Sequence, residues 1–193
     1  MKIAIVDVGC GNIGSVGIAL ERFGIDPLVT GEAEEIAAAD KVVLPGVGAA
    51  GYAMEQIEAR GLAPVLRGLR QPALGICLGM QLLFEGSEEE DTTCLGLIPG
   101  RVRKLEPAQG LPVPHMGWSR IQVRDEDIGL FPGDYVYFAH SFACDPGETT
   151  VASAEYGRPI PAVVRSGNWT GAQFHPERSG EAGARFLRRW LER

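Results

Sequence analysis

The chain lacks paired cysteines. Its four cysteines lie far apart and form no C-x-x-C pair: Cys10, Cys77, Cys94 and Cys144. Neither a disulfide framework nor a zinc site is therefore indicated, and a reducing cytoplasm is the expected compartment. We expect no metal ion and no cofactor.

Long apolar runs and excess basic charge are also missing. No segment approaches the ~20 apolar residues of a membrane-spanning helix, and the N-terminus has no signal-peptide pattern. The net charge is −7, whereas binding to phosphate backbones needs a basic surface. Neither a membrane nor a nucleic acid is thus an expected partner. With no linker or repeat, residues 1–193 are expected to form a single domain.

The first part of the chain alternates between apolar runs and helical patterns. The runs at residues 2–8, 41–44 and 72–76 predict strands buried on both faces of a largely parallel sheet, with a short strand at 26–30. Helical patterns separate these strands, at residues 18–23, 32–39, 52–60 and 63–69. This order predicts an open α/β sheet with helices on both faces.

The second half of the chain has short alternating segments instead. They predict antiparallel strands and hairpins at residues 118–123, 135–139, 150–155, 161–165 and 168–174. A last helix is expected at 181–191, whereas residues 107–114 predict a surface loop and acidic residues 87–91 a solvated loop or helix end. The predicted fold class is α/β, an open, mostly parallel sheet with an added antiparallel part in the C-terminal half.

Cys77 lies between Gly75 and Gly79, where an apolar run gives way to a helical pattern. Glycines at this spacing allow a turn so tight that the side chain between them is exposed above the sheet, as in a nucleophile elbow. A helix N-terminus behind the thiol would favour its thiolate. The alternative is a small apolar cysteine that ends a buried strand.

A cysteine nucleophile needs a base or ion-pair partner that is itself oriented by a third group. The chain has only three histidines, His115, His140 and His175. Only His175 has a carboxylate close in sequence, that of Glu177, and Pro176 between them prevents an ordinary strand from continuing. Glu177 can hold one ring nitrogen protonated and aim the other at the thiol.

Backbone N–H groups near the thiol could stabilise an oxyanion. The N–H of Leu78 directly follows the candidate nucleophile, and a glycine-rich loop at 45–48 ends the neighbouring strand. An N–H of Val47 or Gly48 is the expected second donor. Alternatively, this loop is an ordinary strand-to-helix turn.

Gly9, Gly11 and Gly14 formally match the G-x-G-x-x-G fingerprint of dinucleotide-binding folds. That fingerprint expects an acidic residue at the end of the second strand, whereas Glu32 follows a Thr-Gly pair. A nicotinamide site would also leave the cysteine and histidine motifs unexplained. We interpret the glycines as a turn that lets a loop approach a partner or the core.

Taken together, three stretches resemble the class I (triad) glutamine amidotransferases: residues 45–48, 75–81 and 173–177. Three more look like one branch of that family, the glutaminase subunits of imidazole glycerol phosphate synthase: residues 7–12, 114–118 and 137–142. The resemblance implies a flavodoxin-like fold and a triad of Cys77 as nucleophile, His175 as base and Glu177 as its orienter. It further implies that glutamine is hydrolysed to glutamate and ammonia.

The same resemblance implies the substrate and partner contacts. The residues expected to contact the substrate glutamine are Gly46, Gln81, Glu89, Ser141 and Phe142. Those expected on the face that docks the cyclase subunit of imidazole glycerol phosphate synthase are Asn12, Trp118 and Arg178. Met116, an apolar residue on the same polar loop as Trp118, is a further candidate for this face. Alternatively, that loop tucks its apolar residues into its own core.

The family's chemistry calls for the partner, because ammonia released into neutral water becomes ammonium, which is not nucleophilic. We expect the ammonia to reach the cyclase by a shielded route, for the synthesis of imidazole glycerol phosphate and AICAR in histidine biosynthesis. The loop at 46–48 is expected to hold its N–H donor turned away from the oxyanion until the partner docks. The alternatives are a glutaminase subunit of another class I amidotransferase and a non-catalytic interaction module.

The sequence departs from the family pattern at three positions outside the triad. Val8 replaces the usual Tyr, Ser119 the common Asn, and Phe142 the usual Tyr. Because Phe142 has no hydroxyl group, any contact between this residue and the substrate is expected through its backbone.

Overall fold

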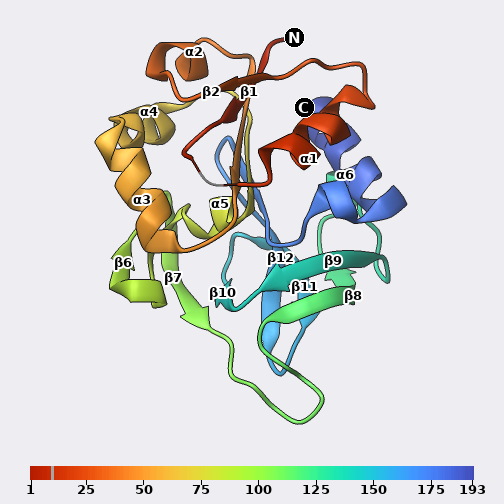
Figure 1. Cartoon of the computed structure of the whole chain (residues 1–193). Helices are drawn as coiled ribbons and strands as arrows, with labels where there is room; N and C mark the ends of the chain where they lie inside the picture. The colour runs from red at the N-terminus through yellow and green to blue at the C-terminus, as the bar shows by residue number, and fades with distance from the viewer. Residues whose placement is uncertain (10) are drawn as a thin grey trace.

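A nine-stranded sheet runs through the centre of the molecule, in the order β2-β1-β3-β4-β13-β12-β11-β8-β9 (Figure 1). This computed structural model describes residues 1–9 and 11–193. The strands of one half pair in parallel: β1 (Ile3–Val6), β2 (Leu28–Thr30), β3 (Lys41–Gly46), β4 (Ala73–Cys77) and β13 (Trp169–Ala172). Every residue of β1, β3 and β4 is buried, as their continuous apolar runs predicted.

Strand β13 joins the two halves of the sheet. It pairs in parallel with β4 and antiparallel with β12 (Pro159–Ser166). The sheet continues antiparallel through β11 (Thr150–Glu155), β8 (His115–Val123) and β9 (Tyr135–His140). The antiparallel part is confirmed, but the sequence pattern placed β13 wholly within it. Because β4 and β13 are parallel neighbours, their carboxyl ends lie at the same edge of the sheet.

Helices cover both faces of the sheet (Figure 1). On one face, α2 (Ala33–Ala37), α3 (Ala50–Ala59) and α4 (Leu62–Gly68) share a core with Ala4 and Val6. On the other, α1 (Ile13–Glu21) and α6 (Gly180–Leu191) share a core with Ile3 and Ile5. Alternate residues of β1 thus serve the two cores, which is the period-two rule for strands. Among the described residues, no helix is long and apolar enough to cross a membrane.

A second, four-stranded sheet was not predicted from the sequence. It consists of β10 (Phe142–Cys144), β7 (Ile98–Lys104), β5 (Phe84–Ser87) and β6 (Thr92–Thr93), in that order. The acidic run at 87–91 ends β5 and forms a 3₁₀ turn, η1 (Glu89–Asp91). Strand β7 contains Pro99, Gly100 and alternating basic residues, so its local sequence carries no strand signal, and pairing with neighbours supplies the stability instead.

The turn between β4 and α5 (Leu78–Gln81) provides a stability test. A Cβ atom at Gly79 would overlap the Leu44 carbonyl oxygen. We therefore expect Gly79→Ala to lower the free energy of unfolding by about 3 kcal/mol or more. Gly14→Ala is the control, because no atom lies within 4 Å of its Cβ position and alanine is the better helix former. It should raise the free energy of unfolding by about 0.5–1 kcal/mol. Urea unfolding measures both, and unchanged stability of Gly79→Ala would contradict the close packing of α5 on β3.

Candidate active site

Cys77 occupies a strained turn at the end of β4. Its backbone has φ 54° and ψ −110°, a conformation that costs a non-glycine residue about 1–3 kcal/mol and that clusters at functional sites. Gly75 is required here, since a Cβ atom would lie 2.6 Å from the Gly79 carbonyl oxygen. The structure thus has the tight turn predicted for a nucleophile elbow, but Cys77 is only 6% exposed, so the prediction of an exposed side chain was wrong. However, α5 is only four residues long, so the expected help from a helix dipole comes from a single turn.

His175 and Glu177 form a buried pair beside Cys77. The Nδ1 atom of His175 lies 2.8 Å from Oε1 of Glu177, whose side chain is 1% exposed. Glu177 belongs to the 3₁₀ turn η3 (Pro176–Arg178), and residues 173–175 connect this turn to the end of β13. A carboxylate can only accept a hydrogen bond, so Nδ1 carries a proton and Nε2 is the ring atom available to the thiol. This is the orientation that the sequence predicted.

The environment favours a charged His175 at neutral pH. Burial is the largest single influence and lowers the pKa of His175. The hydrogen bonds and charges of Cys77 and Glu177 together outweigh it and raise the pKa to about 10. An imidazolium of this kind stabilises a neighbouring thiolate and can donate a proton to a leaving nitrogen.

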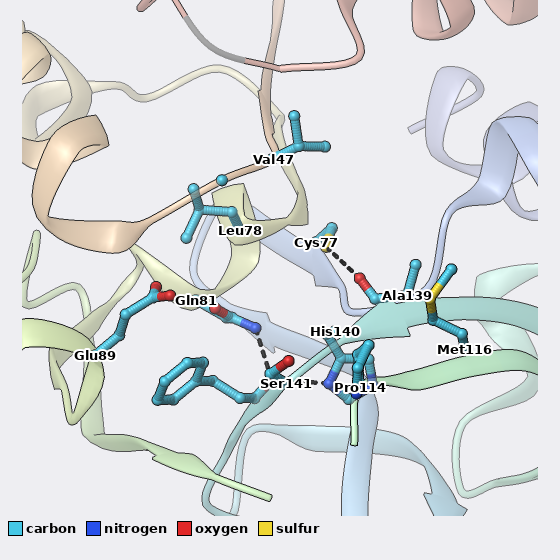
Figure 2. Close-up of a pocket in the computed structure, with 12 residues that line it drawn as sticks. Val47, Cys77, Leu78, Gln81, Glu89, Pro114, Met116, Ala139, His140 and Ser141 are labelled. Atoms are coloured by element: carbon cyan, nitrogen blue, oxygen red, sulfur yellow. Dashed lines mark hydrogen bonds between the residues drawn. The ribbon is translucent and has the colours of Figure 1, made fainter. Parts of the chain in front are cut away.

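A cavity of about 240 Å³ opens in front of Cys77 (Figure 2). It is smaller than the ~300–1,000 Å³ pockets that take drug-sized ligands, so it suits a small molecule. Besides Cys77, its lining includes most of the residues predicted for the oxyanion site and the substrate: Val47, Gly48, Leu78, Gln81, Glu89, Ser141 and Phe142. Pro114, Met116, Ala139 and His140 complete the lining.

Hydrogen bonds hold two of the predicted substrate contacts in place. The Nε2 group of Gln81 donates to the Phe142 carbonyl oxygen (2.8 Å) and to Oε1 of Gln173 (3.0 Å). Both of its protons are thus engaged, and its carbonyl oxygen remains to accept a donor from a ligand. Glu89 accepts a hydrogen bond from the N–H of Ala50 (2.8 Å), which ties η1 to the start of α3.

Phe142 and Gly46, two of the residues predicted to contact the substrate, make other contacts in the structure. The Phe142 carbonyl accepts from both Gln81 and His140, so both lone pairs are used and a substrate contact through this carbonyl is disfavoured. Gly46 lies beside the cavity instead of lining it. A Cβ atom there would be 2.8 Å from both the Gly79 nitrogen and the Leu78 Cβ. The structure therefore gives Gly46 a packing role between β3 and α5.

The residues predicted for a partner face gather beside the cavity. Met116 and Trp118 on β8 are 64% and 54% exposed, which excludes the alternative that they tuck into a core of their own loop. The ring of Tyr137 contacts Trp118 edge-on, with centroids 6.0 Å apart, and the Arg178 guanidinium lies 4.5 Å from the Tyr137 ring. We call Met116, Trp118, Tyr137 and Arg178 the aromatic face.

Two contacts of Glu177 and Cys77 were not predicted. The Nδ2 group of Asn12 donates to Oε1 of Glu177 over 3.3 Å, so a residue expected at the partner face also contacts the carboxylate that is paired with His175. Gln173 is fully buried, and its Nε2 lies 3.9 Å from the sulfur of Cys77. Its place two residues before His175 in the stretch 173–177 was the available signal in the sequence.

The glycine-rich turn after β1 serves this arrangement. Gly9 and Gly11 have positive φ values of 74° and 134°, whereas Cys10 between them lies outside the described residues. Gly11 directly precedes Asn12, whose side chain reaches the carboxylate of Glu177. In residues 1–9 and 11–193, no group of three or more His, Cys, Asp or Glu side chains could hold a metal ion.

The chain belongs to the class-I glutamine amidotransferase family, whose profile matches residues 5–193. Its relatives include the "imidazole glycerol phosphate synthase subunit HisH" of Idiomarina loihiensis, 50% identical over 100% of this chain and 98% of that protein. The subunit of the same name from Vibrio cholerae is 46% identical over 99% of this chain and 98% of that protein. The chain is thus an enzyme of the HisH type within this family.

Solved structures agree on the fold. A crystal structure described as a glutamine amidotransferase superposes with a TM-score of 0.77 at 20% identity, over 98% of this chain and 97% of that one. The structure of PurLQS from Thermotoga maritima gives a TM-score of 0.70 at 21% identity, over 99% and 97% of the two chains. The predicted α/β class is confirmed.

Proposed function

We propose that this chain is the glutaminase subunit of an imidazole glycerol phosphate synthase and that Cys77, His175 and Glu177 are its catalytic triad. The observation that carries the proposal is the buried His175–Glu177 pair beside a cysteine that lies on a strained turn and lines a small cavity. The HisH relatives over the full chain support the same assignment. We also propose that residues 1–193 act as one domain.

The reaction begins when the Cys77 thiolate attacks the side-chain amide carbon of glutamine. The carbonyl oxygen takes the negative charge and is stabilised by the N–H of Leu78 and by one N–H of Val47 or Gly48. His175 gives a proton to the amide nitrogen and the C–N bond breaks. Ammonia departs, and Cys77 remains joined to the glutamyl group as a thioester. His175 then takes a proton from water, which attacks the thioester and releases glutamate.

The ammonia needs a second protein that uses it before it is protonated. The aromatic face lies beside the cavity, is rich in aromatic residues and carries Arg178, which is the composition typical of an interface centre. Asn12 adjoins it through its contact with Glu177. We propose that the cyclase subunit docks here, covers the cavity and receives the ammonia, and that both subunits act in the cytoplasm.

The test is ammonia release from glutamine by the chain alone and with the candidate cyclase carrying its nucleotide ligand. We expect the complex to be faster by roughly 10²-fold, since one badly placed oxyanion donor costs ~10²–10³ in rate. A protein that does not bind this chain, added at the same concentration as the cyclase, serves as the control. Equal rates with and without the cyclase would refute the expectation that docking of the cyclase turns the loop at 46–48 into its active arrangement. If no ammonia is released under either condition, the proposed glutaminase activity is refuted. Stimulation by a different synthase would assign the chain to another acceptor.

A further inference from the structure

Two buried histidines outside the triad face each other across neighbouring strands. His115 on β8 is paired in register with His140 on β9, and the two residues are 2% and 5% exposed. Their rings are hydrogen bonded, with Nδ1 of His115 3.1 Å from Nε2 of His140. The mechanism proposed above uses neither of them, although His140 lines the cavity.

The surroundings keep both rings neutral. Burial lowers the pKa of His115 to about 4. Burial also lowers the pKa of His140 to about 3, with smaller contributions from His115, His175 and Arg158, against the opposing effect of the Phe142 carbonyl. At neutral pH each ring therefore has one N–H donor and one acceptor nitrogen.

The hydrogen-bond partners then determine which nitrogen carries each proton. The Phe142 carbonyl can only accept, so the Nδ1–H of His140 donates to it over 2.8 Å, and Nε2 of His140 must accept. The Nδ1–H of His115 is consequently the donor to His140, which leaves its Nε2 as an acceptor. The Ser119 hydroxyl, 2.8 Å away, donates to that nitrogen. All four groups thus have one consistent direction of donation.

This series of hydrogen bonds connects the cavity with the strand that carries part of the aromatic face. One end is the Phe142 carbonyl, which also accepts from Gln81 in the cavity (Figure 2). The other end is Ser119 on β8, the strand that carries Met116 and Trp118 of the aromatic face. The rings of Phe138 and Tyr156 stack on His115 with centroids 4.7 and 3.9 Å away, so its orientation is fixed by packing.

We propose that Ser119, His115 and His140 form a neutral hydrogen-bond relay that positions the cavity-lining residues Ser141, Phe142 and Gln81 and ties them to the aromatic face. The three relay residues are positioning residues, because they act on the substrate through the Phe142 carbonyl and Gln81. The inference rests on the proposed glutaminase activity and deepens it.

The test compares two variants of one histidine in the complex with the cyclase. His140→Phe keeps a ring but loses both hydrogen bonds, whereas His140→Asn can retain a donor to the Phe142 carbonyl. We expect His140→Phe to raise KM for glutamine about tenfold, with a smaller effect on kcat, because it removes one of the two donors to the Phe142 carbonyl and leaves the buried Nδ1–H of His115 without an acceptor. His140→Asn should recover most of that loss.

A second readout separates positioning from a general loss of structure. Iodoacetamide alkylates Cys77 without using the glutamine contacts, so its rate should stay within about twofold of wild type in both variants. Tyr156→Phe is the matched control, because it keeps the ring stacked on His115 and removes only a hydroxyl that donates to the Pro112 carbonyl. Its KM should be unchanged.

The outcomes are distinct. A wild-type KM in His140→Phe would overturn the relay, and so would equal losses in the Phe and Asn variants together with slower alkylation. If His140→Phe does not fold, Ser119→Ala removes only the first donor and should raise KM two- to threefold, while an unchanged KM would overturn the proposal. If Cys77→Ala still hydrolyses glutamine at the wild-type rate, the proposed function itself fails, whatever the relay variants show.

Discussion

Cys77→Ala is expected to lower the glutaminase rate of the complex by about 10⁴-fold or more. Without the sulfur no thioester forms, and only the stabilisation of the oxyanion and the binding of glutamine remain to assist attack by water. The small volume change and the alanine methyl group should leave the fold intact, because Cys77 already lies at the edge of the cavity. Ammonia release under saturating glutamine measures the effect.

The matched control is Cys94→Ala. Cys94 is also a free, buried thiol, but it lies away from the cavity, and burial raises its pKa to about 11. A thiol of this kind is almost fully protonated at neutral pH and has no catalytic role. Its alanine variant should keep the wild-type rate within about twofold. Wild-type activity in Cys77→Ala, or equal losses in both variants, would contradict the assignment of the nucleophile.

Glu177→Gln is expected to lower kcat/KM by about 10³–10⁴-fold while leaving the backbone unchanged. If the amide oxygen faces His175, the amide NH₂ takes the place of Oε2, a buried atom for which the described residues supply no hydrogen-bond partner. If the amide is turned the other way, its NH₂ faces Nδ1 and forces the ring proton onto Nε2. The first arrangement leaves a buried donor unpaired and the second gives the wrong tautomer, which is the more damaging for catalysis.

The same variant has a pH signature. In the wild type the pKa of His175 is raised above its ordinary value of 6.5 to about 10. The protonated ring therefore contributes stability that is fully present below pH 6.5 and is lost as the pH rises toward 10. Removing the Glu177 charge removes one cause of the raised pKa. The loss of stability, and the alkaline decline of kcat/KM, should thus both begin at lower pH in Glu177→Gln.

Glu181→Gln is the control for the change of carboxylate to amide. The Glu181 side chain is 88% exposed on α6 and forms a surface ion pair with Arg185, which is worth little. Urea unfolding and kcat/KM measured between pH 6 and 10 should match those of the wild type. An alkaline decline at the same pH in Glu177→Gln and in the wild type would contradict the role of Glu177 in raising the pKa of His175.

Local patterns determined the parallel half of the fold and the core of the candidate site. Continuous apolar runs predicted β1, β3 and β4, because a strand that is buried on both faces has apolar side chains on both and no alternating polar residues. The two glycines around Cys77 predicted the tight turn, since only glycine allows the close approach of α5. The His-Pro-Glu spacing predicted the contact between His175 and Glu177, because the two residues are only two positions apart.

Only the tertiary structure decided the contacts between distant segments. Asn12 and Glu177 are 165 residues apart, and the relay from Ser119 to Phe142 exists only because β8 and β9 pair in one register. Strand β10 becomes a strand by pairing with β7, and β7 by pairing with β10 and β5. Hydrogen bonds across strands depend on register and burial, and the hydrophobic periodicity of a single segment does not determine either of them. The sequence by itself thus predicted the three residues of the proposed triad, whereas the tertiary structure decided how the cavity beside Cys77 is held in shape.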